Sequence, residues 1–488
     1  PRLRSLSPSM FFVDENLSAM KNEESTFSWS EWKRPVIAII LTVLSNVVSS
    51  MLAMGEWSYM STVDHSSSAS FYGYASSAYS AAHAVSAFVF AIWAHKISST
   101  KVPLLASQCI ILGASVMYIF VECIPHNRRW WILVCYVLFG VGFGTSPLLR
   151  SYIARVTSEE NRSSAYALQN GANIVGPIAQ IAFAHLPYPG IIVVPPYIKL
   201  HIYSAPVWFA FIINVVAIVI TVLLLEDTEA ITVIRKSEGK DTNHSSFSVG
   251  SIRDRLTSLR ALDIPWLLVA LVIFVAMATS LCDGAIGTVY GPMMSVMYGL
   301  RGEEIVMTMA IVQVACGLIS SALSLLFFVC RLGKHVSCRV LFLFSNVIVI
   351  VGYVITFPFP ITSNPMQPFN ETTMTGCNPL EYPWCDTQLV VNLISCIIMI
   401  TITTSLTTPA AMLSLDTIYS KVIGNIDQNV MQSVIVIADD IVQIVGPIYG
   451  SAIFTAFGIN YIHYINGSIY LLATLVWIAS WKWLLPYN

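Results

Sequence analysis

Charged residues are scarce in this sequence. Asp, Glu, Lys and Arg make up 11% of its 488 positions, whereas they account for about 25% of an ordinary soluble domain. A soluble protein of this length would form two or three domains and would need a charged surface, so this composition excludes that class. The net charge of −2 also gives no reason to expect nucleic acid as a partner.

Sequence motifs of the common enzyme classes are missing as well. The chain has no phosphate-binding loop with its lysine, no zinc-ligand spacing, and no Ser/His/Asp arrangement that a soluble active site would need. We therefore expect neither an enzyme nor an ATP-driven pump, and we expect no cofactor and no metal.

Apolar residues, by contrast, make up 56% of the chain, and its mean hydropathy is +0.70. About 20 consecutive apolar residues are enough to cross a bilayer. The predicted transmembrane helices are 35–55, 69–94, 102–122, 130–149, 164–186, 202–225, 264–290, 303–329, 337–357, 388–412, 428–455 and 463–485. No cleavable signal peptide precedes the first, so we expect it to act as an uncleaved anchor. The sequence thus predicts an all-α membrane protein of twelve helices, with the lipid bilayer as its main partner.

Basic residues are distributed unequally between the two sides of these helices. Of the 25 Lys and Arg residues, only Arg128, Arg129, Lys199 and Arg301 fall on one side. All the others fall on the side of the two termini. Loops rich in Lys and Arg stay in the cytosol, so both termini are predicted to be cytosolic and the loop 358–387 to lie on the opposite side.

The non-cytosolic loop 358–387 carries two potential modifications. Asn370 begins an Asn-Glu-Thr sequon, a glycosylation acceptor, although such short motifs also arise by chance. Cys377 and Cys385 lie close together in the same loop, where an oxidising compartment would allow a disulfide. The other cysteines lie in or beside apolar runs, which indicates small core residues.

A polar connection rich in Ser, Thr and charge divides the helices into two groups of six. This is the organisation of a transporter built from two parallel repeats. The predicted parts are a cytosolic N-terminal tail (1–34), an N-terminal six-helix half (35–225), a cytosolic linker (226–262) and a C-terminal six-helix half (263–488).

Two similar segments support the repeat. NIVGPIAQ places Gly176-Pro177 in the fifth helix, and QIVGPIYG places Gly446-Pro447 in the eleventh. Proline bends a membrane helix, and glycine lets a neighbouring helix approach closely. We therefore expect bent, closely packed helices where the halves meet. Helix 4 carries a further close-packing stripe, Gly140, Gly142 and Gly144.

Three segments carry the most specific motifs of the chain: GVGFGTSPLLRSYIARVTSEENRSSAYALQNGANIVGPIAQ, TGCNPLEYPWC and TIYSKVIG. They resemble a lysosomal family of the major facilitator superfamily, the family linked to neuronal ceroid lipofuscinosis type 7. The resemblance implies the major facilitator fold of two six-helix halves, a late endosomal and lysosomal membrane, and transport of a solute or conduction of chloride. The matching positions are Arg150, Tyr152, Gly176, Pro177, Cys377, Cys385, Tyr419, Lys421, Gly446 and Pro447.

Two superfamily motifs are altered in this chain. Helix 4 usually opens with an arginine before its glycines, and Tyr136 takes that place here. The loop between helices 2 and 3 usually contains an aspartate that locks the cytosolic gate. Here AIWAHKISSTKV keeps only basic character, at His95, Lys96 and Lys101. Both changes argue against the superfamily's usual proton-coupled gating.

Ionisable residues inside the predicted helices are candidates for transport chemistry, because a charge there costs about 2.5–3.5 kcal/mol on insertion scales. Asp283 in helix 7 is followed by Gly284 and Gly287, which predict a local break that admits water or substrate. The alternative is a hydrogen-bonded structural aspartate. Asp439 and Asp440 in helix 11 point about 100° apart, so at most one faces a cavity squarely. Their repulsion favours proton uptake, and pairing with a neighbouring helix is the alternative.

Two further candidates have weaker signals. Glu56 is placed at the luminal end of helix 1, where Trp57 and Tyr59 predict an interfacial aromatic belt. A gate and a plain interfacial carboxylate both remain open for it. His83, in the middle of helix 2, is interpreted as a hydrogen bonder in helix packing, with a sensor of luminal pH as the alternative.

Basic residues gather at the cytosolic helix ends. Arg150 and Arg155 near the end of helix 4, with Lys421 at the end of helix 10, predict a cytosolic gate or an anion-attracting vestibule. Membrane anchoring by the positive-inside rule is the alternative. A matching basic set in the second half is Arg331, Lys334 and Arg339.

Three functions are consistent with these observations. The leading hypothesis is a monomeric secondary carrier that moves a small solute across an endolysosomal membrane by alternating access, with possible proton coupling. The alternatives are an anion-selective conductance on the same fold and a non-transporting scaffold or receptor. No polar cluster in the sequence identifies the small molecule or ion.

Overall fold

Long helices dominate the computed structural model, which describes residues 29–156, 175–194, 198–226, 266–329, 336–361, 363–371, 375–423 and 428–484. In hydrocarbon each backbone N–H and C=O must find its partner within the protein, which favours helices for apolar runs of this length. Within the described ranges, 11 helices are long and apolar enough to cross a membrane.

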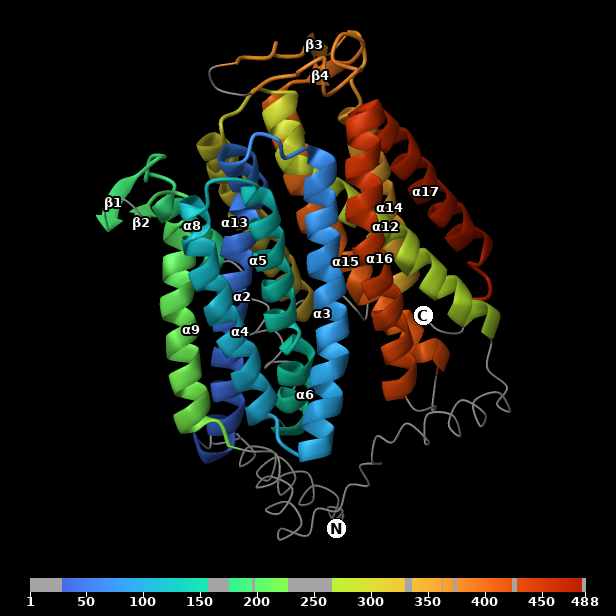
Figure 1. Cartoon of the computed structure of the whole chain (residues 1–488). Helices are drawn as coiled ribbons and strands as arrows, with labels where there is room; N and C mark the ends of the chain where they lie inside the picture. The colour runs from blue at the N-terminus through green and yellow to red at the C-terminus, as the bar shows by residue number, and fades with distance from the viewer. Residues whose placement is uncertain are drawn as a thin grey trace, which may run out of the picture.

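The helices of the first half lie mainly on one side of the molecule, and those of the second half lie mainly on the other (Figure 1). The helices of the first half are α2 (Trp29–Val63), α3 (Ala69–Ile97), α4 (Lys101–Ile119), the 3-10 turn η2 (Val121–Cys123), α5 (Arg128–Phe143), α6 (Ser146–Val156), α8 (Val175–Phe183) and α9 (Ala205–Leu224). Those of the second half are α12 (Trp266–Val296), α13 (Gly302–Val329), α14 (Cys338–Ile355), α15 (Leu393–Ile423), α16 (Gln428–Phe457) and α17 (Ile459–Ala479).

Two predicted helices differ from expectation. Helix 4 is interrupted after Phe143, and α6 continues from Ser146, so Arg150 lies inside a helix instead of ending one. The predicted break in helix 7 is wrong, because α12 runs without interruption from Trp266 to Val296.

Some predicted segments fall partly or wholly outside the described residues. The fifth predicted helix, 164–186, is described only from residue 175, where α8 lies. Nearly all of the predicted linker 226–262 and the whole of the predicted tail up to residue 28 are outside the described ranges. The assignment of these parts stays a prediction.

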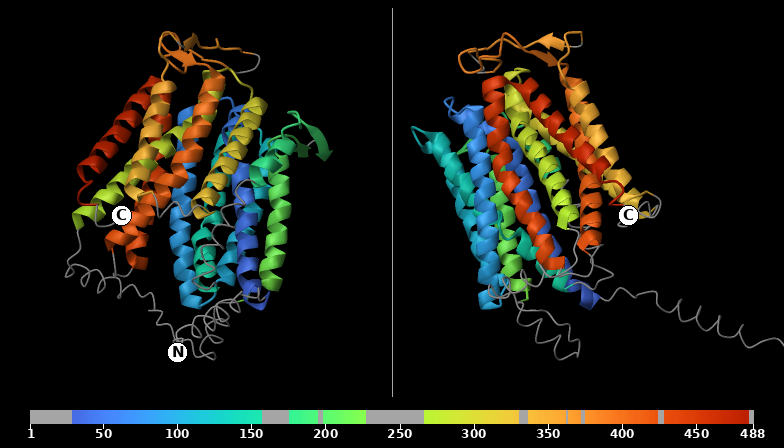
Figure 2. Two further views of the ribbon diagram at one scale, coloured as in Figure 1. Left: turned by 180° about the vertical axis from the view of Figure 1, so that it is seen from behind. Right: turned by 90° about the vertical axis from the view of Figure 1, so that its right-hand side faces the viewer.

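Two short antiparallel sheets of two strands each lie at one end of the bundle, and the sequence did not predict them. β1 (Ile191–Val194) pairs with β2 (Ile198–Leu200) and projects sideways beside α8 and α9, whereas β3 (Ser363–Pro365) pairs with β4 (Leu389–Val391) above the second half (Figures 1 and 2). We call this end of the molecule the loop side. The four residues predicted for the non-cytosolic side all lie at the loop side: Arg128 and Arg129 begin α5, Lys199 lies in β2, and Arg301 directly precedes α13.

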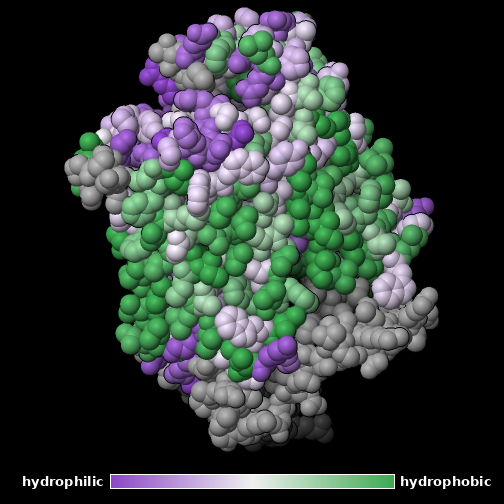
Figure 3. All heavy atoms as spheres, viewed as in Figure 1, coloured by the Kyte–Doolittle hydropathy of each residue, from purple (hydrophilic) through white to green (hydrophobic). Residues whose placement is uncertain are grey.

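On the face shown in Figure 3, apolar side chains cover the middle of the molecule, and hydrophilic side chains gather on the loop side and in smaller patches near the opposite end. Large aliphatic residues such as Leu223 and Leu267 are 72% and 68% exposed. Outward-facing apolar residues over most of a helix length are expected where lipid replaces water. The exposed surface therefore fits the transmembrane helices predicted from hydropathy.

Glycines let the helices of the first half approach closely. A Cβ atom on Gly140 would lie 2.4 Å from the backbone oxygen of Tyr79, and one on Gly144 would lie 2.0 Å from Ser86 Oγ. Both neighbours belong to α3. The predicted glycine stripe therefore packs against a neighbouring helix, and Gly142 packs in the same way against Ile111 of α4.

The loop between α14 and α15 spans the second half and reaches the first. Cys377 and Cys385 form a disulfide, as the sequence predicted. Trp384 donates its indole N–H to the Thr455 oxygen of α16 at 3.2 Å, and Tyr382 is hydrogen-bonded to the backbone of Ala69 at the start of α3. Asn370 is exposed in the same loop, and Thr372 of its sequon lies outside the described residues.

Direct contacts between the halves are found on the loop side. Ser70 of α3 donates its hydroxyl to Thr455 Oγ1 of α16 at 2.9 Å. The Tyr188 N–H, in the loop after α8, donates to Glu303 Oε1 of α13 at 2.7 Å. These bonds hold the two halves together at this end of the molecule.

Candidate functional site

A cavity of about 690 Å³ lies between the two halves, and we call it the central cavity. Its wall is formed by α2, α3, α5 and α8 of the first half and by α12, α13 and α16 of the second. The volume falls within the range of about 300–1,000 Å³ that is typical of small-molecule sites. The charged side chains among its described wall residues are Glu56 and Asp283.

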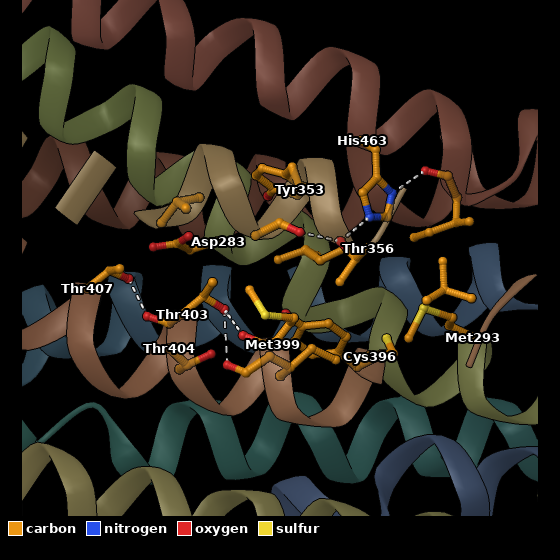
Figure 4. Close-up of a pocket in the computed structure, with 18 of the residues that line it drawn as sticks. Asp283, Met293, Tyr353, Thr356, Cys396, Met399, Thr403, Thr404, Thr407 and His463 are labelled. Carbon is orange, nitrogen blue, oxygen red and sulfur yellow. Dashed lines mark hydrogen bonds between the residues drawn. The ribbon is translucent and has the colours of Figure 1, made fainter. Parts of the chain in front are cut away.

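A second cavity of about 360 Å³ lies inside the second half, and we call it the side cavity (Figure 4). It extends from α12 between α14, α15 and α17 to strand β4. Five residues line both cavities: Asp283, Gly287, Met309, Gln313 and Gln443. The two cavities therefore adjoin each other around Asp283.

Asp283 is both hydrogen-bonded and open to these cavities. Tyr470 of α17 donates its hydroxyl to Asp283 Oδ1 at 2.7 Å. The aspartate nevertheless keeps an exposed surface, and because it lines both cavities that surface faces them. The two interpretations offered by the sequence, a structural aspartate and a cavity residue, thus apply to the same side chain.

The glycines after Asp283 do not break α12. One lets α16 pack closely against it, and the other leaves open space beside the cavities. Gly284 lies against α16, where a Cβ atom would come within 3.8 Å of Gly446 Cα. Gly287 has open space where its side chain would be, with no heavy atom within 4 Å of that position. Gly287 therefore leaves room at the junction of the two cavities.

Glu56 lines the central cavity and accepts a hydrogen bond from the Tyr72 hydroxyl at 3.4 Å. The predicted interfacial belt around it is wrong, since Trp57 and Tyr59 are only 6% and 2% exposed. Tyr59 stacks on Tyr118 at 4.9 Å between ring centroids. Trp57 and Tyr59 therefore belong to the protein interior, because aromatic residues near a helix end can also pack between helices.

Asp439 and Asp440 have different electrostatic partners, as expected for side chains about 100° apart around a helix. The carboxylates of Asp439 and Asp283 repel each other electrostatically. Asp440 interacts with His83 of α3, and His83 is also hydrogen-bonded to the backbone of Phe143. His83 and Asp440 therefore interact electrostatically across the two halves, and the hydrogen bond of His83 to the Phe143 backbone supports the packing interpretation of His83.

The predicted basic vestibule is only partly present among the described residues. Arg150 is exposed and interacts electrostatically with Asp416 of α15, across the two halves. Lys421 is exposed in the last turn of α15. Arg155 lies within α6, and its side chain is outside the described part of the structure.

Of the matching basic set in the second half, the structure describes only Arg339. Arg331 and Lys334 lie outside the described residues. Arg339 is 7% exposed, donates Nη1–H to the Trp481 oxygen at 3.0 Å, and packs over the Trp481 ring at 4.9 Å. This prediction is wrong for Arg339, because the segment after α17 covers it.

The two Gly-Pro pairs occupy similar positions in the two halves. Pro177 of α8 and Pro447 of α16 both line the central cavity. Gly176 abuts Ser50 of α2, and Gly446 abuts Ala285 of α12. In each half the glycine therefore packs against the first helix of that half, while the proline faces the cavity.

Several polar wall residues were missed by sequence reasoning. Thr403, Thr404, Thr407 and Thr408 of α15 line the side cavity (Figure 4). Their spacing of four residues in the run TITTSLTT places them on one face of a helix, so this signal was available. Gln313 and Gln443 also line the cavities, and Tyr470 reaches Asp283 from α17; none of these three belongs to a comparable repeat in the sequence.

No metal site is present in the ranges that the structure describes: no group of three or more His, Cys, Asp or Glu residues could hold an ion there. The described walls of the two cavities offer carboxylates, hydroxyls, amides, the His463 imidazole, the Cys396 thiol and apolar side chains.

The sequence profile of the Major Facilitator Superfamily matches residues 37–374. The chain belongs to the major facilitator superfamily. A relative within this superfamily is major facilitator superfamily domain-containing protein 8 of Xenopus laevis. It is 24% identical over 490 residues, which cover 94% of this chain and 93% of the relative.

Solved structures of other major facilitator proteins share the fold. The inward open form of the xylose transporter XylE from E. coli superposes with a TM-score of 0.61 at 11% identity, covering 92% of this chain and 95% of that chain. The nucleoside transporter NupG gives a TM-score of 0.59 at 11% identity, covering 92% and 99%. The predicted all-α major facilitator fold is thus confirmed. This superfamily member is a multi-pass membrane transporter and not an enzyme.

Proposed function

We propose that this protein carries a small solute across an endolysosomal membrane by alternating access, and that Asp283 and Glu56 couple the movement to protons. The observation that supports the proposal is the central cavity between the halves. Each half contributes one carboxylate to it, Glu56 from α2 and Asp283 from α12. These are the first described helices of the two halves.

The closed loop side supports alternating access. A carrier of this kind exposes its site to one side at a time, by rocking one half against the other. Ser70 with Thr455, and Tyr188 with Glu303, link the halves on the loop side by hydrogen bonds. Breaking these few bonds would let the halves part there, while closure on the opposite side would bring Arg150 toward Asp416.

Two cavity carboxylates supply the chemistry for proton coupling. Placed in a site that water enters, a carboxylate can take up a proton on one side and release it on the other. Tyr470 and Tyr72 hold Asp283 and Glu56 by hydrogen bonds, which fixes each carboxylate toward the cavity. A neutral variant at either position would bind solute without a linked proton.

The charge of the cavity walls favours a carrier over an anion conductance. Among the described residues that line the two cavities there are carboxylates but no Lys or Arg. An anion pathway is usually lined by basic side chains. The endolysosomal location is supported by the family resemblance of the three sequence segments around helices 4, 5 and 10.

Solute profiling of purified organelles tests this function. Localisation of a tagged full-length protein first identifies the organelle, and its solutes are then measured with and without the protein. We expect at least one solute to change, and the Asp283→Asn variant to behave as cells that lack the protein. An unchanged solute profile, or a current that follows the chloride gradient in the same organelles, would overturn the proposal.

Cross-linking tests the alternating mechanism directly. In Ser70→Cys/Thr455→Cys the two thiols replace hydroxyls that are 2.9 Å apart, so oxidation should lock the loop side closed. Transport should stop on oxidation and return on reduction. Each single cysteine variant is the matched control and should be insensitive to oxidant. Full activity of the cross-linked protein would reject alternating access.

A further inference from the structure

The side cavity differs in chemistry from the central cavity that it adjoins. Five methionines line it, together with tyrosine rings and aliphatic residues from α12, α14 and β4, while the four threonines of α15 add hydroxyl groups to one wall. Its methionines are Met293, Met297, Met309, Met399 and Met412. Methionine adapts to ligands of irregular shape and contributes apolar contact, so this cavity suits an apolar group.

A carboxylate lies at the inner end of this apolar space. Asp283 lines both cavities, and Tyr470 holds one of its oxygens at 2.7 Å. No Lys or Arg is found among the described residues of either wall. A ligand cation at Asp283 therefore competes with no Lys or Arg of these walls. The basic side chain among the described residues of the side cavity is His463, whose ring nitrogens are hydrogen-bonded to Thr356 and to the Ile459 oxygen. The nearby tyrosine rings Tyr290 and Tyr353 add favourable contact for a cation.

The junction between the cavities is open. The backbone at Gly287 lines both spaces and has no heavy atom within 4 Å of the position of a Cβ atom. A ligand can therefore place one group in each cavity without displacing a side chain there. The length of the side cavity, from Asp283 to Val391 of β4, runs along the helices.

We propose that the protein binds amines that carry a single apolar chain, with the ammonium group at Asp283 and the chain in the side cavity. This inference deepens the proposed function, on which it rests, by naming the substrate class. The ammonium pairs with the carboxylate, and the chain is buried among the methionines. Polar substituents on the head group would lie in the central cavity.

A homologous series of probes tests the inference. Binding of n-alkyltrimethylammonium ions, from ethyl to hexyl, is measured by calorimetry on the full-length protein in nanodiscs. Each added CH₂ should tighten binding about fourfold, or roughly 200-fold across the series. n-Alkyl sulfonates and n-alkanols of equal length should bind at least about tenfold more weakly. Equal binding of alkanols, or no dependence on chain length, would overturn the inference.

Variants separate the two parts of the site. Asp283→Asn should weaken all the ammonium probes by a similar factor and leave the dependence on chain length in place. Gly287→Leu should abolish that dependence, because its side chain fills the junction. Gly467→Leu is the matched control, since Gly467 also has no heavy atom within 4 Å but lines neither cavity; it should bind like the wild type.

A second variant tests the same point if Gly287→Leu does not fold. Thr404→Phe narrows the side cavity from α15 and should weaken hexyl more than ethyl probes. A dependence on chain length that persists in both variants would reject the side cavity as the chain site. If the probes do not bind but solutes still change in organelles, the substrate class is wrong and the carrier function is retained. If the probes bind but no solute changes, the binding site is retained and the carrier function is rejected.

Discussion

Gly73 of α3 lies directly against Ser451 of α16: a Cβ atom on Gly73 would come within 1.8 Å of Ser451 Oγ and 2.7 Å of the Pro447 oxygen. The two helices belong to different halves. Only a glycine allows this approach, because any larger side chain must push the helices apart. The contact therefore sets how closely the halves meet near the loop side.

Gly73→Val should hold the loop side open. The added methyl groups have no room beside Ser451, so the halves separate and the central cavity becomes accessible. A Ser76→Cys reporter, at a residue of the cavity wall, should then react about tenfold faster with a membrane-impermeant thiol reagent applied from the loop side. Gly113→Val, at a glycine with open space around it, is the control. Equal labelling of the two variants would contradict the role of Gly73.

Tyr470→Phe should weaken transport without unfolding the protein. The variant loses the hydroxyl that Asp283 Oδ1 accepts, and a hydrogen bond to a charged group contributes about 1.5–3 kcal/mol. Solute flux in organelles should fall about tenfold or more. Tyr461→Phe is the matched control, because Tyr461 lies on the same helix, is 50% exposed and lines neither cavity. Wild-type flux in Tyr470→Phe would show that the bond is dispensable.

Removal of the disulfide should destabilise the loop side. Cys377 and Cys385 are separated by 8 positions, and the chain-entropy relation gives about 2.5 kcal/mol for a loop of that length. A Cys377→Ala/Cys385→Ala variant should have a lower Tm by fluorescence-detected unfolding. Reductant should lower the Tm of the wild type and leave that of the variant unchanged. A reductant effect of equal size on both proteins would point to another cause.

Asp64 should stabilise the protein in a pH-dependent manner. Burial raises the pKa of this carboxyl, but hydrogen bonds from Ser66 and from the backbone N–H of Arg129 outweigh burial and hold the pKa below its ordinary value of 3.8. A group with a lowered pKa in the folded state stabilises above its unfolded pKa, and this contribution is lost as pH falls through the folded pKa.

The Tm difference between wild type and Asp64→Asn tests this. It should be constant from neutral pH to about pH 5 and shrink below about pH 4. Asp386→Asn, at an exposed aspartate of the loop, is the control and should change Tm little at any pH. A Tm difference for Asp64→Asn that grows on acidification would contradict the assignment.

Eleven of the twelve predicted helices lie where the sequence placed them, because a long apolar run in lipid has few alternatives to a helix. The fifth is described only from residue 175, so its full span stays a prediction. Local features were harder. Gly284 and Gly287 suggested a broken helix, yet glycine is compatible with a helix when a neighbour packs closely against it or a cavity adjoins it. Trp57 and Tyr59 suggested a membrane interface, since an aromatic pattern does not distinguish lipid from a neighbouring helix.

The candidate site was predicted in part. Asp283 and Glu56 stood out because a carboxylate is rare in an apolar run. Gln443 and Tyr470 did not, since uncharged polar residues are common in membrane helices. Only the three-dimensional structure brings the Tyr470 hydroxyl to Asp283 and places Gln443 on the same cavity walls. Arg339 was misjudged because sequence does not reveal that Trp481 covers it.

The helix α16 is held on two faces at once. Gly446 and Gly450 fit it against Ala285 of α12, within its own half, and Ser451 fits it against Gly73 of the other half. A helix gripped in this way cannot slide along one neighbour without straining its seat on the other. A molecule that enters beside α12 and displaces α16 would therefore also strain the contact between Ser451 and Gly73. In this way α16 would couple occupancy of the cavities to the separation of the two halves.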